Sequence, residues 1–220
     1  ALEWASSYPE RVYSAIPIAT SYRHSAQNIA FHEVGRQAIM NDPNWQKGNY
    51  YNTKNKPRHG LSVARMIAHI TYLSEGAFQE KFGRDMQSKV LSWGFDADFQ
   101  VESYLRHQGI SFVDRFDANS YLYITRAMDY FDLSHSYDGD LFLAFKKTKC
   151  KLLIVSFTSD WLFPSSESLA IVKALNKTAA DVSFVEINSD KGHDSFLLEI
   201  KDLYKILSGF ISGAARKKGI

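Results

Sequence analysis

The stretch Lys151-Leu-Leu-Ile-Val-Ser-Phe-Thr-Ser-Asp-Trp, residues 151–161, decides the fold class of this chain. Its apolar run is typical of a strand that is buried on both faces of a parallel sheet. A helical pattern follows at residues 165–176, then a second strand at 182–187 and a last helix from about 196 to 212. The order strand, helix, strand, helix indicates a doubly wound α/β sheet.

Two polar motifs follow these strands. Ser159-Asp-Trp comes directly after the first strand, and Gly192-His-Asp comes a few residues after the second. Neighbouring parallel strands end at the same edge of a sheet, about 5 Å apart, so we expect Asp160 and His193 to form a hydrogen bond. Alone, Asp160 is readily explained as a helix cap and His193 as an ordinary loop histidine. Together they predict the acid and the base of a catalytic triad, in the order that α/β hydrolases use.

The nucleophile of such a triad is missing from the sequence. In this fold the serine lies in a G-x-S-x-G elbow between a strand and a helix. The chain contains no such motif, and its nearest approach, Gly60-Leu-Ser-Val-Ala, lies in a predicted helix with no strand before it. We therefore expect the nucleophile to lie outside these 220 residues.

The rest of the chain is predicted to be mostly helical. Residues 12–20 form one further apolar run, which we interpret as a buried strand despite Pro17. No strand pattern appears between residues 22 and 147, where helices are predicted at 25–39, 61–74, 76–82, 96–116 (with a break at Gly109), 120–129 and 139–145. The predicted organisation is an α/β core in two pieces, residues 1–21 and 148–220, with a helical lid insertion at residues 22–147.

The composition argues against several classes of function. The chain is 45% hydrophobic and 23% charged with a net charge of +2, which is ordinary for a soluble protein and gives no reason to expect a nucleic-acid partner. Its one cysteine excludes an internal disulfide and fits a reducing compartment. No apolar window is long enough to span a membrane, and no signal peptide is recognisable at residue 1. A cytoplasmic protein is expected.

Several motifs along the whole chain carry a family resemblance. They are Ala1-Leu-Glu-Trp-Ala, Ser25-Ala-Gln-Asn-Ile-Ala-Phe, Gly60-Leu-Ser-Val-Ala-Arg-Met-Ile-Ala-His, Arg115-Phe-Asp-Ala-Asn-Ser-Tyr-Leu, Ser159-Asp-Trp and Gly192-His-Asp-Ser-Phe-Leu-Leu. In combination, the chain resembles the homoserine O-acetyltransferases of the α/β-hydrolase superfamily. The resemblance implies a partial α/β-hydrolase fold with a large helical lid. In that family the helix matching Ala1-Leu-Glu-Trp follows the serine elbow, so the resemblance implies that the serine and the oxyanion hole precede Ala1 and that this chain alone is inactive.

The resemblance also implies roles for individual residues. Asp160 matches the triad acid and His193 the base. Arg65 matches a substrate arginine, Tyr72 a companion tyrosine, and Asp194 a second substrate residue. Homoserine carries an α-carboxylate and an α-ammonium group, which suit an arginine and an aspartate respectively.

The helix predicted at residues 61–74 shows why pattern alone does not assign Arg65. Its apolar residues form a stripe at helical spacing: Val63, Met66, Ile67, Ile70 and Leu73. Arg65, His69 and Tyr72 fall on the opposite face, and such a polar face usually meets only water. The role of Arg65 and Tyr72 therefore comes from the resemblance, and His69 is interpreted as structural.

The same resemblance implies the acyl donor, the partners and the absence of a cofactor. Relatives that use succinyl-CoA tend to carry an arginine two residues after the triad aspartate, and Leu162 occupies that position here. Leu162 therefore predicts acetyl-CoA as co-substrate with L-homoserine, because an apolar side chain penalises a buried carboxylate. No metal or prosthetic group is implied. Family members are typically homodimers joined through the helical insertion.

Three other functions stay open at this point. One is succinyl transfer by the same machinery. Another is an esterase of the same fold with water as acceptor, against which Arg65 and Asp194 argue, since an esterase needs no amino-acid clamp. The third is a noncatalytic dimerisation module, against which the retained Asp160 and His193 argue.

Overall fold

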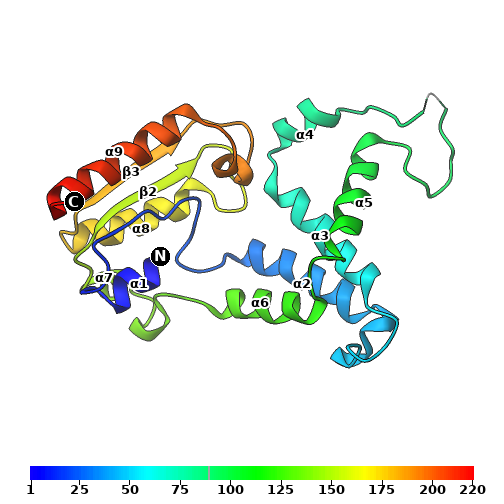
Figure 1. Cartoon of the computed structure of the whole chain (residues 1–220), viewed down its shortest axis with the longest axis horizontal. Helices are drawn as coiled ribbons and strands as arrows, with labels where there is room; N and C mark the ends of the chain where they lie inside the picture. Colours follow the sequence, from blue (N-terminus) through cyan, green and yellow to red (C-terminus); the bar gives the residue numbers. More distant parts are fainter. Residues whose placement is uncertain (89) are drawn as a thin grey trace. The chain divides into compact units, whose positions relative to one another are not determined.

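The computed structural model describes residues 1–88 and 90–220, and the chain divides into two compact units. The sheet unit comprises residues 1–23 and 132–220, and the helical unit comprises residues 24–131. Figure 1 shows the elements of each unit along the chain. Among the described residues, no helix combines the length and the apolar character needed to cross a membrane.

The sheet unit is built on three parallel strands in the order β1-β2-β3. Its elements are α1 (Leu2–Ser7), β1 (Ser14–Ala15), η2 (His135–Tyr137), α7 (Leu141–Phe145), β2 (Lys151–Phe157), α8 (Ser165–Lys177), β3 (Val182–Ile187), η3 (His193–Leu197) and α9 (Lys201–Lys218). Strands β2 and β3 pair over their whole length, from Leu152 opposite Val182 to Phe157 opposite Ile187. The β-α-β-α order predicted for this part of the chain is confirmed.

The strand predicted at residues 12–20 is much shorter than expected. Only Ser14–Ala15 forms a strand beside β2, and Ile18 makes a separate bridge to Val155. Pro17 lies between the two paired segments and has no N–H to donate, although its carbonyl accepts from the backbone of Val155. The proline therefore interrupts the ladder.

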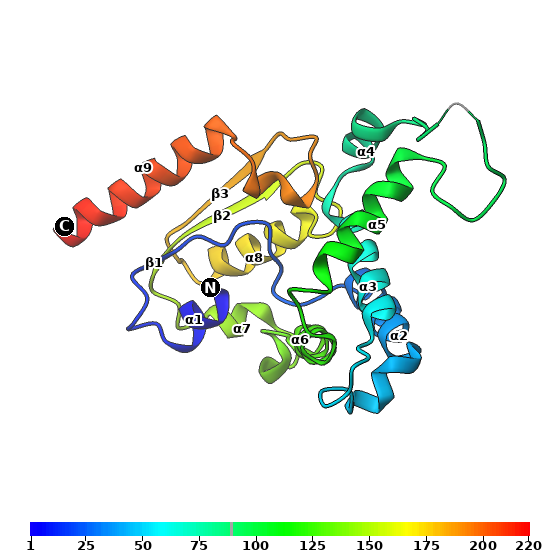
Figure 2. The same cartoon turned by 45° about the vertical axis from the view of Figure 1, so that its right-hand side comes forward.

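The central strand of the sheet unit is buried on both faces. Leu152 and Ile154 face a cluster that includes Ile171 of α8, whereas Leu153 and Val155 face a cluster that includes Leu203 of α9. Figure 2 shows α8 and α9 on opposite sides of the sheet. The continuous apolar run of β2 thus has partners for both of its alternating faces, as a strand between two helical layers requires.

The helical unit contains α2 (Ala26–Met40), η1 (Pro43–Gly48), α3 (Arg58–Tyr72), α4 (Glu75–Phe82), α5 (Gln100–Phe112) and α6 (Ala118–Tyr130). Helix α3 packs closely on α2 and α5 through two glycines. A Cβ on Gly60 would lie 2.4 Å from the Ala38 carbonyl oxygen, and one on Gly109 would lie 2.2 Å from Ser62 Oγ. The break predicted at Gly109 is therefore wrong: α5 continues through it, and the glycine allows the helices to approach.

Two predicted boundaries also differ from the structure. The helical insertion was expected to reach residue 147, but Leu133, Leu141 and Phe145 are buried in the core of the sheet unit, because the apolar side chains of α7 have their partners there. The last helix was expected at residues 196–212, but α9 ends at Lys218. Gly219 caps it in the left-handed conformation, and the basic residues of the last turn suit the negative end of the helix dipole.

Candidate active site

Asp160 lies in the turn that follows β2, and its side chain is fully buried. Its Oδ1 atom accepts hydrogen bonds from the backbone N–H groups of Leu162 (3.0 Å) and Phe163 (2.8 Å). These bonds compensate for the loss of water around a buried carboxylate. They also fix its orientation, so that the second oxygen, Oδ2, points to one partner.

That partner is His193, whose Nδ1 lies 2.8 Å from Asp160 Oδ2. His193 begins the short helix η3 after β3, behind Gly192, which has φ 77° and ψ −150°, a conformation that side chains disfavour. The Gly192 N–H donates to Ser159 Oγ at 2.9 Å and so joins the two loops. The hydrogen bond that the sequence predicts between Asp160 and His193 is present.

A set of hydroxyl groups braces the histidine loop, and sequence reasoning did not single them out. Ser195 is fully buried, and its Oγ donates to the Gly192 carbonyl at 2.6 Å and lies 2.8 Å from Ser189 Oγ. Thr158 Oγ1 accepts from the Ser189 N–H at 3.1 Å. The only signal in the sequence was the concentration of serines around the two polar motifs.

The imidazole of His193 is held between aromatic rings. The ring centroids of Phe163 and Phe196 lie 5.1 and 5.4 Å from it, and its side chain is only 15% exposed. With Nδ1 donating to Asp160, the ring carries its lone pair on Nε2. His193 can therefore accept a proton at Nε2, while the Asp160 carboxylate stabilises the imidazolium that results.

The other two predicted residues of the sheet unit flank this pair. Leu162 is half-buried two residues after Asp160, and its N–H supports that carboxylate whatever its side chain. Asp194 follows His193 directly, in the first turn of η3, and is also half-buried.

Arg65 belongs to the helical unit, on α3. Its guanidinium lies over the ring of Phe112, 4.6 Å from the centroid, and its Nη1 is 3.5 Å from the Tyr72 hydroxyl. Its Nε is buried without a hydrogen-bond partner, and no carboxylate of the helical unit, in the part of it that the structure describes, forms an ion pair with Arg65. Within its own unit the charge of Arg65 is held by aromatic rings and is not balanced.

His69, one turn along α3, is buried, and its Nδ1 lies 3.1 Å from the Tyr104 hydroxyl. Burial, and next the charge of Arg65, lowers the pKa of His69 to about 4. The faces predicted for this helix are wrong, since Val63 and Ile70 are 43% and 40% exposed while His69 is 9% exposed. Because α3 contacts both α2 and α5, its small residues determine the buried face.

A buried Asp–His pair at the carboxyl edge of a parallel sheet, in that order along the chain, defines a class of proteins: α/β enzymes that activate a nucleophile through a histidine. The family model of the α/β hydrolase fold matches residues 1–200, and the chain belongs to this family. The partial α/β-hydrolase fold expected from the sequence is thereby confirmed.

Individual members of the family can be compared with this chain. The chain is 65% identical over 220 residues to the homoserine O-acetyltransferase of Rhodospirillum rubrum, covering 100% of this chain and 56% of that protein. The crystal structure of homoserine O-acetyltransferase from Bacillus anthracis matches with a TM-score of 0.79 at 23% identity, covering 87% of this chain and 51% of that one. Esterase E22 matches with a TM-score of 0.83, also at 23% identity, over 96% and 57% of the two chains. The two structures support the fold alone, and the chain spans about half the length of the curated relatives it matches.

Proposed function

We propose that these residues are part of a homoserine O-acetyltransferase, which transfers an acetyl group from acetyl-CoA to the hydroxyl of L-homoserine in methionine biosynthesis. The observation that carries the proposal is the 65% identity to an enzyme of that name along the whole chain. The Asp160–His193 pair supports it, because a buried carboxylate 2.8 Å from an imidazole is the arrangement that acyl transfer through a serine needs.

The proposed mechanism is ping-pong through an acyl-serine, with the serine outside residues 1–220. His193 takes the serine proton as the hydroxyl attacks the thioester, and returns a proton to the departing thiolate of coenzyme A. It then takes the proton of the homoserine hydroxyl as that oxygen attacks the acyl-serine, and it returns the proton to the departing serine oxygen. Asp160 stabilises the imidazolium in each half-reaction. The scheme uses no metal or prosthetic group.

Arg65 and Asp194 are proposed to bind the two charged groups of homoserine. An unbalanced, partly buried guanidinium suits the α-carboxylate, with Tyr72 beside it. Asp194, next to the base, suits the α-ammonium group. Leu162 is proposed to favour the acetyl donor, because a succinyl carboxylate beside it would lose water without gaining a partner.

The setting of the enzyme is also a proposal. We expect a cytoplasmic homodimer that associates through the helical unit. The exposed side chains of Tyr123 and Tyr130 on α6, 79% and 75% accessible, support an interface there, since large exposed aromatic residues are enriched at protein contacts.

An esterase of the same fold is the second candidate, because the Asp160–His193 pair would serve equally well with water as the acceptor. It would release acetate to water and would not need homoserine. The test is therefore to measure release of coenzyme A from acetyl-CoA by the full-length gene product, with and without L-homoserine. The proposal expects release that depends on homoserine and yields O-acetylhomoserine, whereas equal release without homoserine would overturn it in favour of the esterase. Residues 1–220 alone are expected to be inactive in the same assay.

A further inference from the structure

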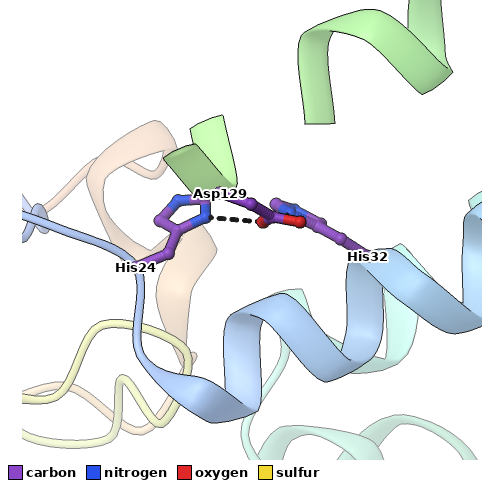
Figure 3. A group of neighbouring side chains, drawn as sticks. All are labelled: His24, His32 and Asp129. Carbon is purple, nitrogen blue, oxygen red and sulfur yellow. Dashed lines mark hydrogen bonds and ion pairs between the residues drawn. The ribbon is translucent and has the colours of Figure 1, made fainter. Parts of the chain in front are cut away.

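A cluster of two histidines and one aspartate lies in the helical unit, and none of the three is among the proposed catalytic or substrate-binding residues. His24 precedes α2, His32 lies within α2, and Asp129 lies near the end of α6 (Figure 3). The Nδ1 atoms of His32 and His24 are 2.7 and 3.4 Å from the same carboxylate oxygen, Asp129 Oδ1. Their side chains are 21%, 9% and 4% exposed for His32, His24 and Asp129.

The convergence of these atoms points to a cation. We propose that His24, His32 and Asp129 bind a divalent transition-metal ion such as Zn²⁺, with a water molecule as the fourth ligand. Two imidazole nitrogens and one carboxylate oxygen are ligands of the type that Zn²⁺ takes in proteins. With metal–ligand bonds of about 2.0–2.1 Å, tetrahedral ligand atoms lie about 3.3 Å apart. The His24–Asp129 separation already fits, and the shorter His32–Asp129 contact needs to widen by roughly 0.6 Å by the same geometry.

The surroundings orient the carboxylate. The second oxygen of Asp129, Oδ2, lies 2.7 Å from Nη1 of Arg36, a side chain that is only 3% exposed. Arg36 in turn contacts Glu33 at 3.0 Å, and Arg126 approaches Glu33 at 3.8 Å. Ligand carboxylates are commonly held by such outer contacts. The positive charge of Arg36 repels a divalent cation, and the carboxylates of Asp129 and Glu33 beside Arg36 offset this repulsion.

The position of the cluster suggests what an ion would do. His24 is the first residue of the helical unit, and Asp129 lies close to its last residue, Phe131. An ion bound by both would therefore join the two segments through which the chain enters and leaves this unit. Because the ion binds only the folded arrangement, it would stabilise the unit by mass action. The proposed role is structural and does not depend on the acyl-transfer chemistry.

The experiment uses the full-length protein after treatment with a chelator. ZnCl₂ is titrated by calorimetry, CoCl₂ by visible absorption, and thermal melts are recorded with and without Zn²⁺. Variants His24→Gln and His32→Gln keep a polar group beside Asp129 but remove the imidazole ligand. The matched control is His107→Gln, an exposed histidine on α5.

The proposal expects one equivalent of Zn²⁺ in the parent protein and in the control, the absorption of a four-coordinate Co²⁺ site, and a Zn²⁺-dependent rise in Tm. Each ligand variant should weaken binding by at least about 100-fold and lose the rise in Tm, because each removes one of three protein ligands. Melts without metal show whether each variant folds. Absence of stoichiometric binding, or binding equal in all four proteins, would overturn the proposal and leave a hydrogen-bonded His–Asp–His network.

Discussion

The sheet unit and the helical unit hold their buried charges in opposite ways. In the sheet unit, the carboxylate of Asp160 has two backbone N–H donors on one oxygen and His193 on the other. In the helical unit, the guanidinium of Arg65 lies over aromatic rings and beside the Tyr72 hydroxyl, its Nε is buried without a hydrogen-bond partner, and no described carboxylate of the unit pairs with it. A charge with all its partners in place is pre-organised for catalysis, whereas a charge left unbalanced costs stability and favours a ligand of opposite charge.

The largest effect should come from disrupting the balanced pair. In Asp160→Asn the amide oxygen can still accept from the two backbone N–H groups, but its NH₂ group faces Nδ1 of His193 and imposes the wrong tautomer. We expect kcat for acetyl transfer to fall roughly 10⁴-fold with little change in Tm. The control is Asp138→Asn, an exposed position with φ 53° that asparagine tolerates. A loss of less than tenfold in Asp160→Asn would exclude the triad role.

The next test removes the unbalanced charge. Arg65→Met keeps an unbranched apolar side chain over Phe112 but deletes the guanidinium. We expect kcat/KM for homoserine to fall about 100-fold, from the loss of charge-assisted hydrogen bonds, with the acylation half-reaction nearly unchanged. Tm should stay the same or rise, since a partly buried cation with no counter-charge in the helical unit is removed. Steady-state kinetics, acylation by rapid quench and thermal melts measure these three quantities.

Arg58→Met is the matched control on the same helix. Arg58 is exposed and already paired with Asp114 at 2.6 Å, so its loss should leave homoserine kinetics unchanged. Equal losses in both half-reactions of Arg65→Met would contradict the assignment, because a residue that binds only homoserine cannot act before homoserine arrives.

The same contrast explains how much the sequence could predict. In the sheet unit, strand order and the shared edge bring Asp160 and His193 together, so two motifs sufficed to predict a hydrogen bond between residues 33 positions apart. The limits of β3 were also predicted to the residue, since Asp181 and Asn188, which favour turns, border it on either side. The strand predicted at residues 12–20 was too long, because Pro17 interrupts the ladder within it.

In the helical unit, the hydrophobic pattern of the sequence predicted less of the structure. The apolar stripe of α3 predicted the wrong buried face, because burial there follows the close approaches at Gly60 and Gly109 rather than hydrophobic spacing. The cluster of His24, His32 and Asp129 joins residues about a hundred positions apart, with no sheet edge to bring them together. The likeness to known enzymes, rather than periodicity, singled out Arg65.

A smaller effect is expected at the acyl-donor position. Leu162→Arg places a cation two residues after Asp160 without disturbing the backbone N–H that supports the carboxylate. We expect the ratio of kcat/KM for succinyl-CoA to that for acetyl-CoA to rise about tenfold or more, as a charged partner compensates for desolvation of the succinyl carboxylate. Leu162→Met, which keeps the apolar character, should leave the ratio unchanged. A parent protein that already uses succinyl-CoA faster than acetyl-CoA would contradict the proposed donor.

The smallest effect concerns the pH dependence of stability in the helical unit. The pKa of His69 lies at about 4 in the folded protein, below its ordinary value of 6.5, because burial and the charge of Arg65 disfavour the protonated ring. Between these two values the unfolded chain binds a proton that the folded chain does not, so stability should decrease as the pH falls through this range and the loss should be complete below about pH 4.

His69→Gln removes this proton uptake, and its Tm should fall less than that of the parent between pH 7.5 and pH 4.5. His24, whose pKa is also lowered by burial, contributes equally to both proteins, and the exposed His107→Gln should behave like the parent. Arg65→Met offers an independent check, since losing the neighbouring charge should raise the pKa of His69 and narrow the acid-sensitive range. An equal decrease in Tm for His69→Gln and the parent over this range would contradict the lowered pKa of His69, and with it the effect of the Arg65 charge on that pKa.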